Sequence, residues 1–145
     1  MLFSIVIPTY NRLPILSKCL AALEAQKGLE QGDHFEVVLV DDGSTDGTVL
    51  WLEENQQQLS HLRLVCQEHG GPALGRNLGV KEANGEVIIF IDSDLIVLPS
   101  FLAEHSRSLR KFWQDRGNRL CFTYGAVINT HNFEFPCSEP HKLSD

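Results

Sequence analysis

Residues 86–98 read EVIIFIDSDLIVL, an apolar stretch interrupted by Asp92, Ser93 and Asp94. The apolar residues before Asp92 are continuous rather than alternating, which is the pattern of a strand that is buried on both faces of a sheet. Such a strand should not end in two carboxylates without compensation, because an unpaired buried charge is costly. The stretch therefore predicts a strand of a covered parallel sheet with a charged site at its carboxyl end.

The same pattern recurs along the chain, with helical spacing of apolar residues between successive strands. Strands are predicted at 2–8, 35–40, 62–66, 86–91 and 120–128, and helices at 13–25, 48–57, 72–83 and 101–113. This alternation is typical of an α/β fold with a doubly wound, mainly parallel sheet covered by helices on both faces. We expect one domain over 1–128, followed at 129–145 by a loop or an incomplete element.

Composition narrows the classes of function and the cellular compartment. The chain has 145 residues and a net charge of −7, which disfavours nucleic acid as a partner. It contains no apolar run of the roughly 18 residues that a membrane span needs. The four cysteines form no CxxC pair, so we expect free thiols in a reducing compartment. We expect the protein in the cytoplasm or at the cytoplasmic face of a membrane.

Polar and glycine-rich segments follow the first four predicted strands, at 8–12, 41–47, 68–71 and 92–94. In a doubly wound sheet, ligands bind beyond the carboxyl ends of the strands. Turns alone do not require acidic or glycine-rich residues at four strand ends. The sequence therefore predicts a ligand crevice at this edge of the sheet.

Asp92 and Asp94 stand two apart in an extended segment, so their side chains should point to the same side. One or two carboxylates together with substrate phosphates suit Mg²⁺ or Mn²⁺. The alternative is that one aspartate caps a helix near Pro99 while the other is solvated. A glycosidase pair is disfavoured, since its carboxylates must flank a sugar from opposite sides.

Two other segments suggest a ligand but match no standard motif. Residues 42–53 nearly have the spacing of a calcium loop, yet a strand pattern rather than a helix precedes them. Residues 70–77, GGPALGRN, open a helix without forming a dinucleotide-binding GxGxxG. Glycines before a helix let a ligand approach the backbone, and Arg76 could reach back toward the crevice or remain a surface cation. The histidines have no metal-ligand spacing, so zinc is not expected.

Taken together, SIVIPTYNR (4–12), VVLVDDGSTDGT (37–48) and GGPALGRNLGVKEANGEVIIFIDSDL (70–95) resemble the nucleotide-sugar-binding part of the family-two inverting glycosyltransferases. These enzymes have the GT-A fold, which is Rossmann-like. The resemblance covers roughly residues 2–128. It implies transfer of a sugar from a nucleotide-diphosphate sugar to an acceptor hydroxyl, assisted by Mn²⁺ or Mg²⁺.

The resemblance also implies roles for individual residues. The nucleobase pocket would be lined by Pro8, Thr9 and Tyr10, with Asp42 accepting a hydrogen bond from the base and Asp41 beside it. Arg76 would lie near the base and phosphates, close to Gly71 at the start of its helix. Asp92 and Asp94 look like the DxD motif, with Asp94 on the metal and Asp92 near the ribose or a metal-bound water.

The chain departs from the family at its end. Family members continue into a half that carries the acceptor surface and a general base, so we expect that base beyond Asp145 and interpret the chain as a fragment. The acceptor, a glycan or a lipid-linked molecule, is not readable. Two alternatives stay open: a non-catalytic module that binds a nucleotide diphosphate, and a nucleotidyltransferase. The latter is disfavoured because PTYNR is not a glycine- and arginine-rich phosphate loop.

Overall fold

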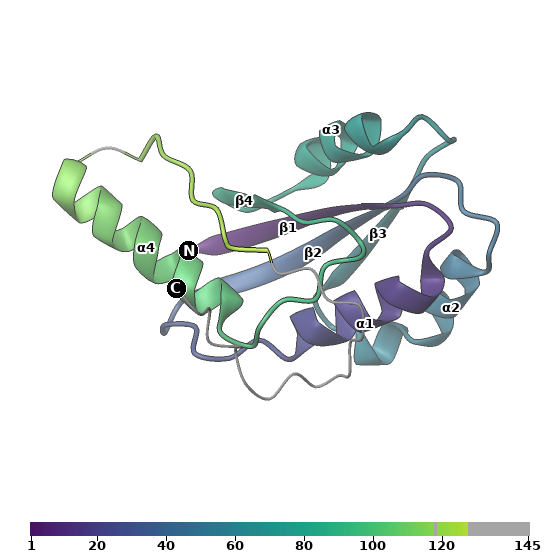
Figure 1. Ribbon diagram of the computed structural model, residues 1–145, viewed down its shortest axis with the longest axis horizontal. Helices are drawn as coiled ribbons and strands as arrows, with labels where there is room; N and C mark the ends of the chain where they lie inside the picture. The colour runs from purple at the N-terminus through teal and green to yellow at the C-terminus, as the bar shows by residue number, and fades with distance from the viewer. Residues whose placement is uncertain (118, 128–145) are drawn as a thin grey trace.

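The computed structural model, which describes residues 1–117 and 119–127, is a four-stranded sheet with helices on both faces (Figure 1). The strands are β1 (Leu2–Thr9), β2 (His34–Asp41), β3 (Leu62–Cys66) and β4 (Val87–Phe90). The helices are α1 (Leu13–Glu24), α2 (Thr48–Glu54), α3 (Pro72–Glu82) and α4 (Phe101–Arg116), with a short 3₁₀ turn, η1, at Gln56–Gln58. The predicted α/β class and the first four strands are confirmed, but β4 lies at the edge of this sheet and is only partly buried, so it is not buried on both faces as expected.

All the strand pairs are parallel and the order is β3-β2-β1-β4. The register places Thr9 beside Asp41, and Asp41 beside Cys66, so three strands end at one level. The chain crosses from β3 to the far side of β1 through α3, which makes β1 and β2 the central strands. Their carboxyl ends therefore lie in the middle of the edge where ligands bind in such folds.

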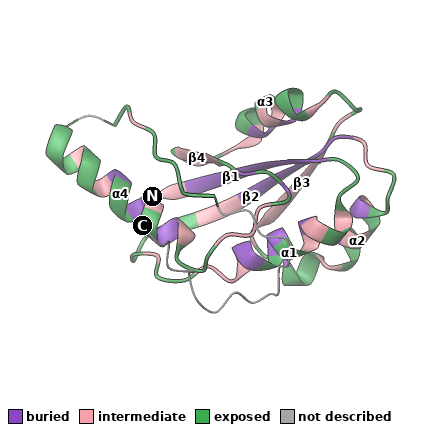
Figure 2. Cartoon of the chain, viewed as in Figure 1, coloured by how far each residue is buried: buried purple, intermediate pink, exposed green. Residues whose placement is uncertain are grey.

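The two faces of the sheet carry cores of different size. On one face, Ile5, Ile7 and Leu39 pack with α1, α2 and the start of α4, and the helices contribute Leu16, Leu20, Leu23, Leu52 and Leu102. On the other face, Val6, Val38 and Val40 pack with Leu78 of α3. Figure 2 shows β1 and most of β2 as buried, as the continuous apolar runs predicted.

The predicted strand at 120–128 is wrong over its described part, because residues 119–127 belong to no helix or strand. The side chains there are open to solvent: Leu120, Phe122 and Tyr124 are 87–89% exposed. Burial is what stabilises a strand of this apolar kind, and none is available at that place. Ile128 and the segment 129–145 lie outside the described residues, so the boundary at 128 stays a prediction.

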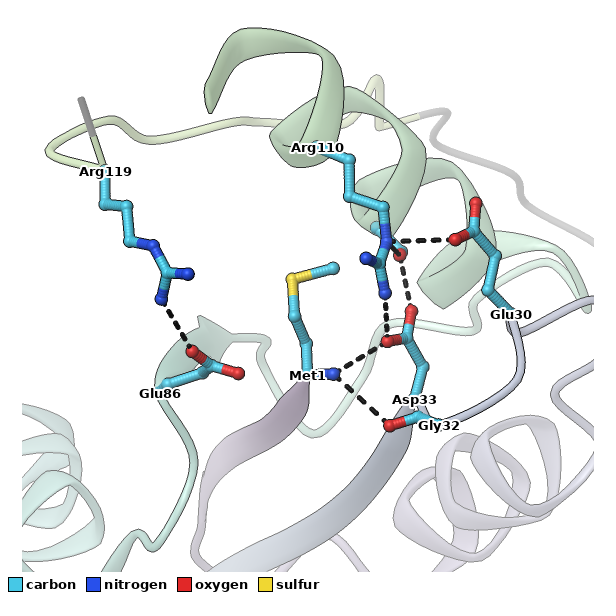
Figure 3. A network of polar contacts seen from close by, with 8 residues as sticks. Met1, Glu30, Gly32, Asp33, Glu86, Arg110 and Arg119 are labelled. Atoms are coloured by element: carbon cyan, nitrogen blue, oxygen red, sulfur yellow. Dashed lines mark hydrogen bonds and ion pairs between the residues drawn. The ribbon is translucent and has the colours of Figure 1, made fainter. Parts of the chain in front are cut away.

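A polar network fixes α4 against the amino ends of β1 and β2 (Figure 3). The carboxylate of Asp33 has no exposed side-chain area and pairs with the Met1 amine at 2.8 Å and with Arg110 at 2.5 Å. Ser106 donates to its second oxygen at 2.6 Å. Burial alone would raise the pKa of Asp33, but these hydrogen bonds and charges outweigh burial and lower it. The network lies at the end of the sheet opposite the predicted crevice.

Two further expectations concern the membrane and the cysteines. No helix in the described ranges is both long and apolar enough to span a membrane. Cys19, Cys66 and Cys121 are free thiols, as expected, whereas Cys137 falls outside the described residues. Burial raises the pKa of Cys19 to about 12, so this thiol is a core group and not a nucleophile.

Candidate nucleotide-sugar site

Asp42 follows β2 and its buried carboxylate holds the turn that leads into α3. Its Oδ1 accepts hydrogen bonds from the Gln67 amide and the Gly70 N–H, at 2.5 and 2.9 Å. Its Oδ2 accepts the Gly71 N–H and pairs with Nδ1 of His69, both at 2.8 Å. Burial acts to raise the pKa of Asp42, but these four donors outweigh it and the pKa is lowered. Asp42 is therefore an anion around which the loop before α3 is built.

Gly71 is the residue at which this loop becomes a helix. It precedes α3 with a φ of 90°, a backbone conformation that residues other than glycine rarely adopt. Its N–H turns toward Asp42 rather than along the helix. Arg76 lies on the second turn of α3, as the sequence predicted.

Asp41 and Thr9 end β2 and β1 side by side. Both are buried, at 2% and 4% exposure. Asp41 Oδ2 accepts the Ser44 N–H at 3.0 Å, so one of its oxygens serves the loop after β2. Within the described residues, Asp41 Oδ1 and Thr9 Oγ1 are buried without a hydrogen-bond partner. Buried polar atoms usually have a hydrogen-bond partner, so the ends of these two strands are candidates for contact with a ligand.

Asp92 and Asp94 follow β4, and each carboxylate pairs with an arginine from another element. Asp92 binds Arg76 of α3 at 2.5 Å, and Asp94 binds Arg12 of the loop after β1 at 2.6 Å. The two aspartate side chains are 59% and 46% exposed, so their charges are not buried. Neither caps α4, which begins after Ser100 without a side-chain cap. The compensation expected for these carboxylates is therefore supplied by two arginines.

The loops after β1 and β2 are joined by reciprocal hydrogen bonds. Asn11 donates its N–H to Ser44 Oγ at 2.9 Å, and its Oδ1 accepts the Thr45 N–H at 2.7 Å. Asp46 accepts the Leu13 N–H at the start of α1 at 3.0 Å and also binds Thr48 at the start of α2. These contacts fix the two loops that carry the predicted base-binding residues as one unit.

Substituting Asn11 tests how much this connection between the two loops, here called the joint, stabilises the protein. Asn11 has a φ of 51°, which asparagine tolerates better than alanine does. We expect Asn11→Ala to lower the free energy of unfolding by about 2 kcal/mol, through the lost hydrogen bond and backbone strain. Asn11→Gly, which loses only the bond, should cost about 1 kcal/mol. Urea denaturation measures both, and equal stability of the alanine variant and the wild type would contradict the role of the joint.

Tyr10 and Pro8 come from the same strand end but lie in different surroundings. The Tyr10 ring is 42% exposed and stacks on His69, with ring centroids 4.1 Å apart. Pro8 is buried below α3, where a Cβ added to Gly75 would meet its Cβ at 3.1 Å. Tyr10 is thus open to a ligand, whereas Pro8 supports the helix that carries Arg76.

Sequence reasoning missed four residues that shape this site: Asn11, Arg12, Gln67 and His69. Asn11 and Arg12 stood within the PTYNR segment, where only the first three residues were given roles. His69 stood within the predicted polar segment 68–71 and Gln67 directly before it, but no spacing rule connects them with Asp42, 25 or more positions earlier.

A divalent cation fits the donor set at the end of β4. The two exposed carboxylates are hard oxygen ligands, and Mg²⁺ or Mn²⁺ is commonly held by one or two carboxylates plus substrate phosphates. Among the described residues, no group of three or more histidine, cysteine, aspartate or glutamate side chains could hold a metal ion. A cation held by Asp92 and Asp94 would take its remaining ligands from elsewhere.

Fold and site together define an α/β domain that gathers a buried carboxylate, an exposed aromatic ring, two arginines and two exposed carboxylates at the carboxyl ends of its parallel strands. Residues 4–115 match the profile of glycosyl transferase family 2. The chain belongs to this family, and the resemblance expected from the sequence is confirmed.

Two curated relatives illustrate the match. The chain is 35% identical over 105 residues to the uncharacterized glycosyltransferase YfnE of Bacillus subtilis, covering 72% of this chain and 26% of the relative. It is 38% identical over 95 residues to the poly(ribitol-phosphate) β-N-acetylglucosaminyltransferase TarS of Staphylococcus aureus, covering 65% and 16%. The chain therefore spans about a quarter or less of the length of these relatives.

Solved structures agree with the GT-A assignment. S. aureus TarS 1–349 in complex with UDP-GlcNAc aligns with a TM-score of 0.67 at 34% identity, covering 77% of this chain and 32% of that one. The Pyrobaculum calidifontis mannosyltransferase PcManGT in complex with GDP-Man and Mn²⁺ aligns with a TM-score of 0.66 at 29% identity, covering 74% and 32%.

Proposed function

We propose that this chain is the donor-binding part of an inverting, metal-dependent glycosyltransferase, which transfers a sugar from a nucleotide-diphosphate sugar to an acceptor hydroxyl. The observation that carries the proposal is the pairing of Asp92 with Arg76 and of Asp94 with Arg12. Four exposed charged groups are gathered there at one end of the sheet. They supply both the cations that bind phosphates and the carboxylates that bind a divalent metal.

Each end of the donor would meet a different part of the crevice. The base would stack on Tyr10 and donate to Asp42, since a carboxylate suits an N–H of uracil or guanine. Pro8 and Thr9, which are buried at the end of β1, would line the site behind the base. Asp41 would lie beside Asp42. The diphosphate would lie with Arg76 and Arg12, near the Gly71 backbone. Base recognition is thus assigned to the ends of β1 and β2, and phosphate recognition to α3 and the loop after β1.

Asp92 and Asp94 would hold Mn²⁺ or Mg²⁺ together with the diphosphate. A bound divalent cation neutralises the charge that develops on a diphosphate leaving group. In the structure, Arg12 and Arg76 pair with the two aspartates. On donor binding we expect both guanidinium groups to exchange a carboxylate for a phosphate, so that total charge in the crevice stays balanced.

The chemistry at the acceptor is proposed by analogy with the family. A general base would take the proton of the acceptor hydroxyl as that hydroxyl attacks the anomeric carbon. We assign no described residue to this role. The acceptor would be a glycan or a lipid-linked molecule, met in the cytoplasm or at the cytoplasmic face of a membrane. Binding of a nucleotide diphosphate without transfer is the alternative for the chain as it stands.

Calorimetric titration with UDP and with GDP, each with and without Mn²⁺, tests the donor site. We expect weak binding of one nucleotide, at least about tenfold tighter in the presence of the metal, because the carboxylates bind phosphate only through a cation. Absence of binding by both nucleotides would contradict the proposed function. A hydrolysis assay with the matching nucleotide sugar then separates the two descriptions, since turnover supports the enzyme and its absence supports the binding module.

A further inference from the structure

The side chain of His69 lies against the two residues that are proposed to contact the base. Its ring stacks on that of Tyr10, with centroids 4.1 Å apart and planes 27° from parallel. Its Nδ1 lies 2.8 Å from Oδ2 of Asp42 and 3.2 Å from the Asp42 carbonyl oxygen. Both neighbours accept, so Nδ1 carries the proton and donates to Asp42.

These two contacts are the ones that a nucleobase would make. Uracil and guanine are planar rings with a ring N–H beside a carbonyl group, and they stack on an aromatic side chain while the N–H donates to a carboxylate. The imidazole of His69 is also a planar ring whose N–H donates to the Asp42 carboxylate while one face covers Tyr10. His69 therefore makes with Tyr10 and Asp42 the same two kinds of contact that a nucleobase would make.

We propose that His69 is an internal stand-in for the nucleobase: its ring takes the contacts with Tyr10 and Asp42 that the base would make, and it must leave before the donor binds. The inference rests on the proposed function, because it takes Tyr10 and Asp42 as base contacts. In this closed arrangement every strong acceptor position on Asp42 is used. A base can reach the carboxylate only by replacing one of its donors.

His69 is the donor that is most easily replaced, because the other side-chain donor to Asp42, Gln67, is half-buried. The Gly70 and Gly71 N–H groups belong to the backbone that starts α3, and moving them would undo the turn. The side chain of His69 is 57% exposed, whereas that of Asp42 is 3% exposed, so the histidine can swing into solvent while the aspartate stays. The stand-in also keeps a buried carboxylate satisfied while no ligand is bound, which would otherwise be costly.

The consequence is a lower apparent affinity for the donor. When only a fraction of the molecules has the base site open, the apparent dissociation constant rises by the inverse of that fraction. Removing the imidazole should therefore strengthen nucleotide binding, although it removes an aromatic group from the site. A histidine that merely supported the Tyr10 ring, or that contacted the base itself, would have the opposite effect.

The test is calorimetric titration of wild type and His69→Ala with UDP and with GDP in the presence of Mn²⁺. We expect His69→Ala to bind the preferred nucleotide about threefold to tenfold more tightly. His61→Ala is the matched control, because His61 also stacks on an aromatic ring, Phe35, at 4.0 Å and pairs with a carboxylate, Glu24, at 2.8 Å. His61 precedes β3, at the end of the sheet away from the crevice, so its loss should leave the affinity unchanged.

A second measurement follows the ring directly. In NMR spectra of the wild type, the His69 ring protons should be shifted by the Tyr10 ring current, and saturating nucleotide should remove that shift. Unchanged or weaker binding by His69→Ala would overturn the stand-in while leaving the donor site intact, as would ring signals that keep their shift in the bound state. If neither protein bound a nucleotide, the proposed function itself would fail, and the inference with it.

Discussion

Asp94→Ala should lose metal-dependent nucleotide binding. In the presence of Mn²⁺ we expect the affinity for the preferred nucleotide to fall at least about tenfold, to its value without metal, because the cation would lose one of its two carboxylate ligands. Without metal, the affinity should not fall, because the substitution frees Arg12 from its 2.6 Å contact with Asp94 and leaves it available to the phosphates. Calorimetry with and without the metal measures both effects.

Glu104→Ala is the control for this experiment. Glu104 also pairs with an arginine, Arg107, at 2.6 Å, and both side chains are exposed, but the pair lies on α4. Its removal should change neither affinity nor metal dependence, since an exposed ion pair contributes little. An Asp94→Ala variant with wild-type affinity in Mn²⁺ would show that the metal, if one is used, is held elsewhere.

Gly79→Ala should destabilise the protein more than the Asn11 substitutions do. Gly79 is the point at which α3 lies closest to the sheet, and a Cβ there would come 2.3 Å from Cγ1 of Val6 and 3.3 Å from Cγ2 of Val40. Val6 is fully buried in the central strand and cannot turn away. We expect a loss of about 3 kcal/mol in the free energy of unfolding, the upper end of the usual cost of overpacking.

A double variant shows whether this contact is the cause. Val6→Ala removes the methyl group that the new Cβ would meet. The double variant should therefore lose at least about 1 kcal/mol less free energy of unfolding than the two single variants lose in sum. Asn77→Ala, an exposed position in the same helix, controls for helix propensity and should not destabilise. Additive losses in the double variant would mean that Gly79 matters for another reason.

The sequence predicted the sheet well because its strands are continuously apolar. Runs such as 2–8 and 35–40 can be satisfied only between two layers of helices, and the structure buries both. The helix at 48–57 proved shorter, with α2 ending at Glu54 before a 3₁₀ turn. The strand at 120–128 failed because an apolar pattern cannot show whether a partner layer exists.

The candidate site was predicted in its residue types but not in its internal bonds. The polar strand ends revealed Asp42, Asp92 and Asp94, since topology brings the ends of parallel strands together. Which donor meets which carboxylate depends on loop conformation, and the pairing of Asp94 with Arg12 joins residues 82 positions apart. No local pattern encodes such a contact, so the roles of Arg12 and His69 emerged only from the three-dimensional arrangement.

The strand order has a consequence for the growing chain on the ribosome. β1 is made first but lies between β2 and β4, and its second neighbour, β4, begins only at Val87. Until that residue has emerged, one side of the most buried strand of the protein offers free backbone groups to any other extended segment nearby. During translation, β1 therefore has an unpaired edge at which it can aggregate, and pairing with β4 removes that edge.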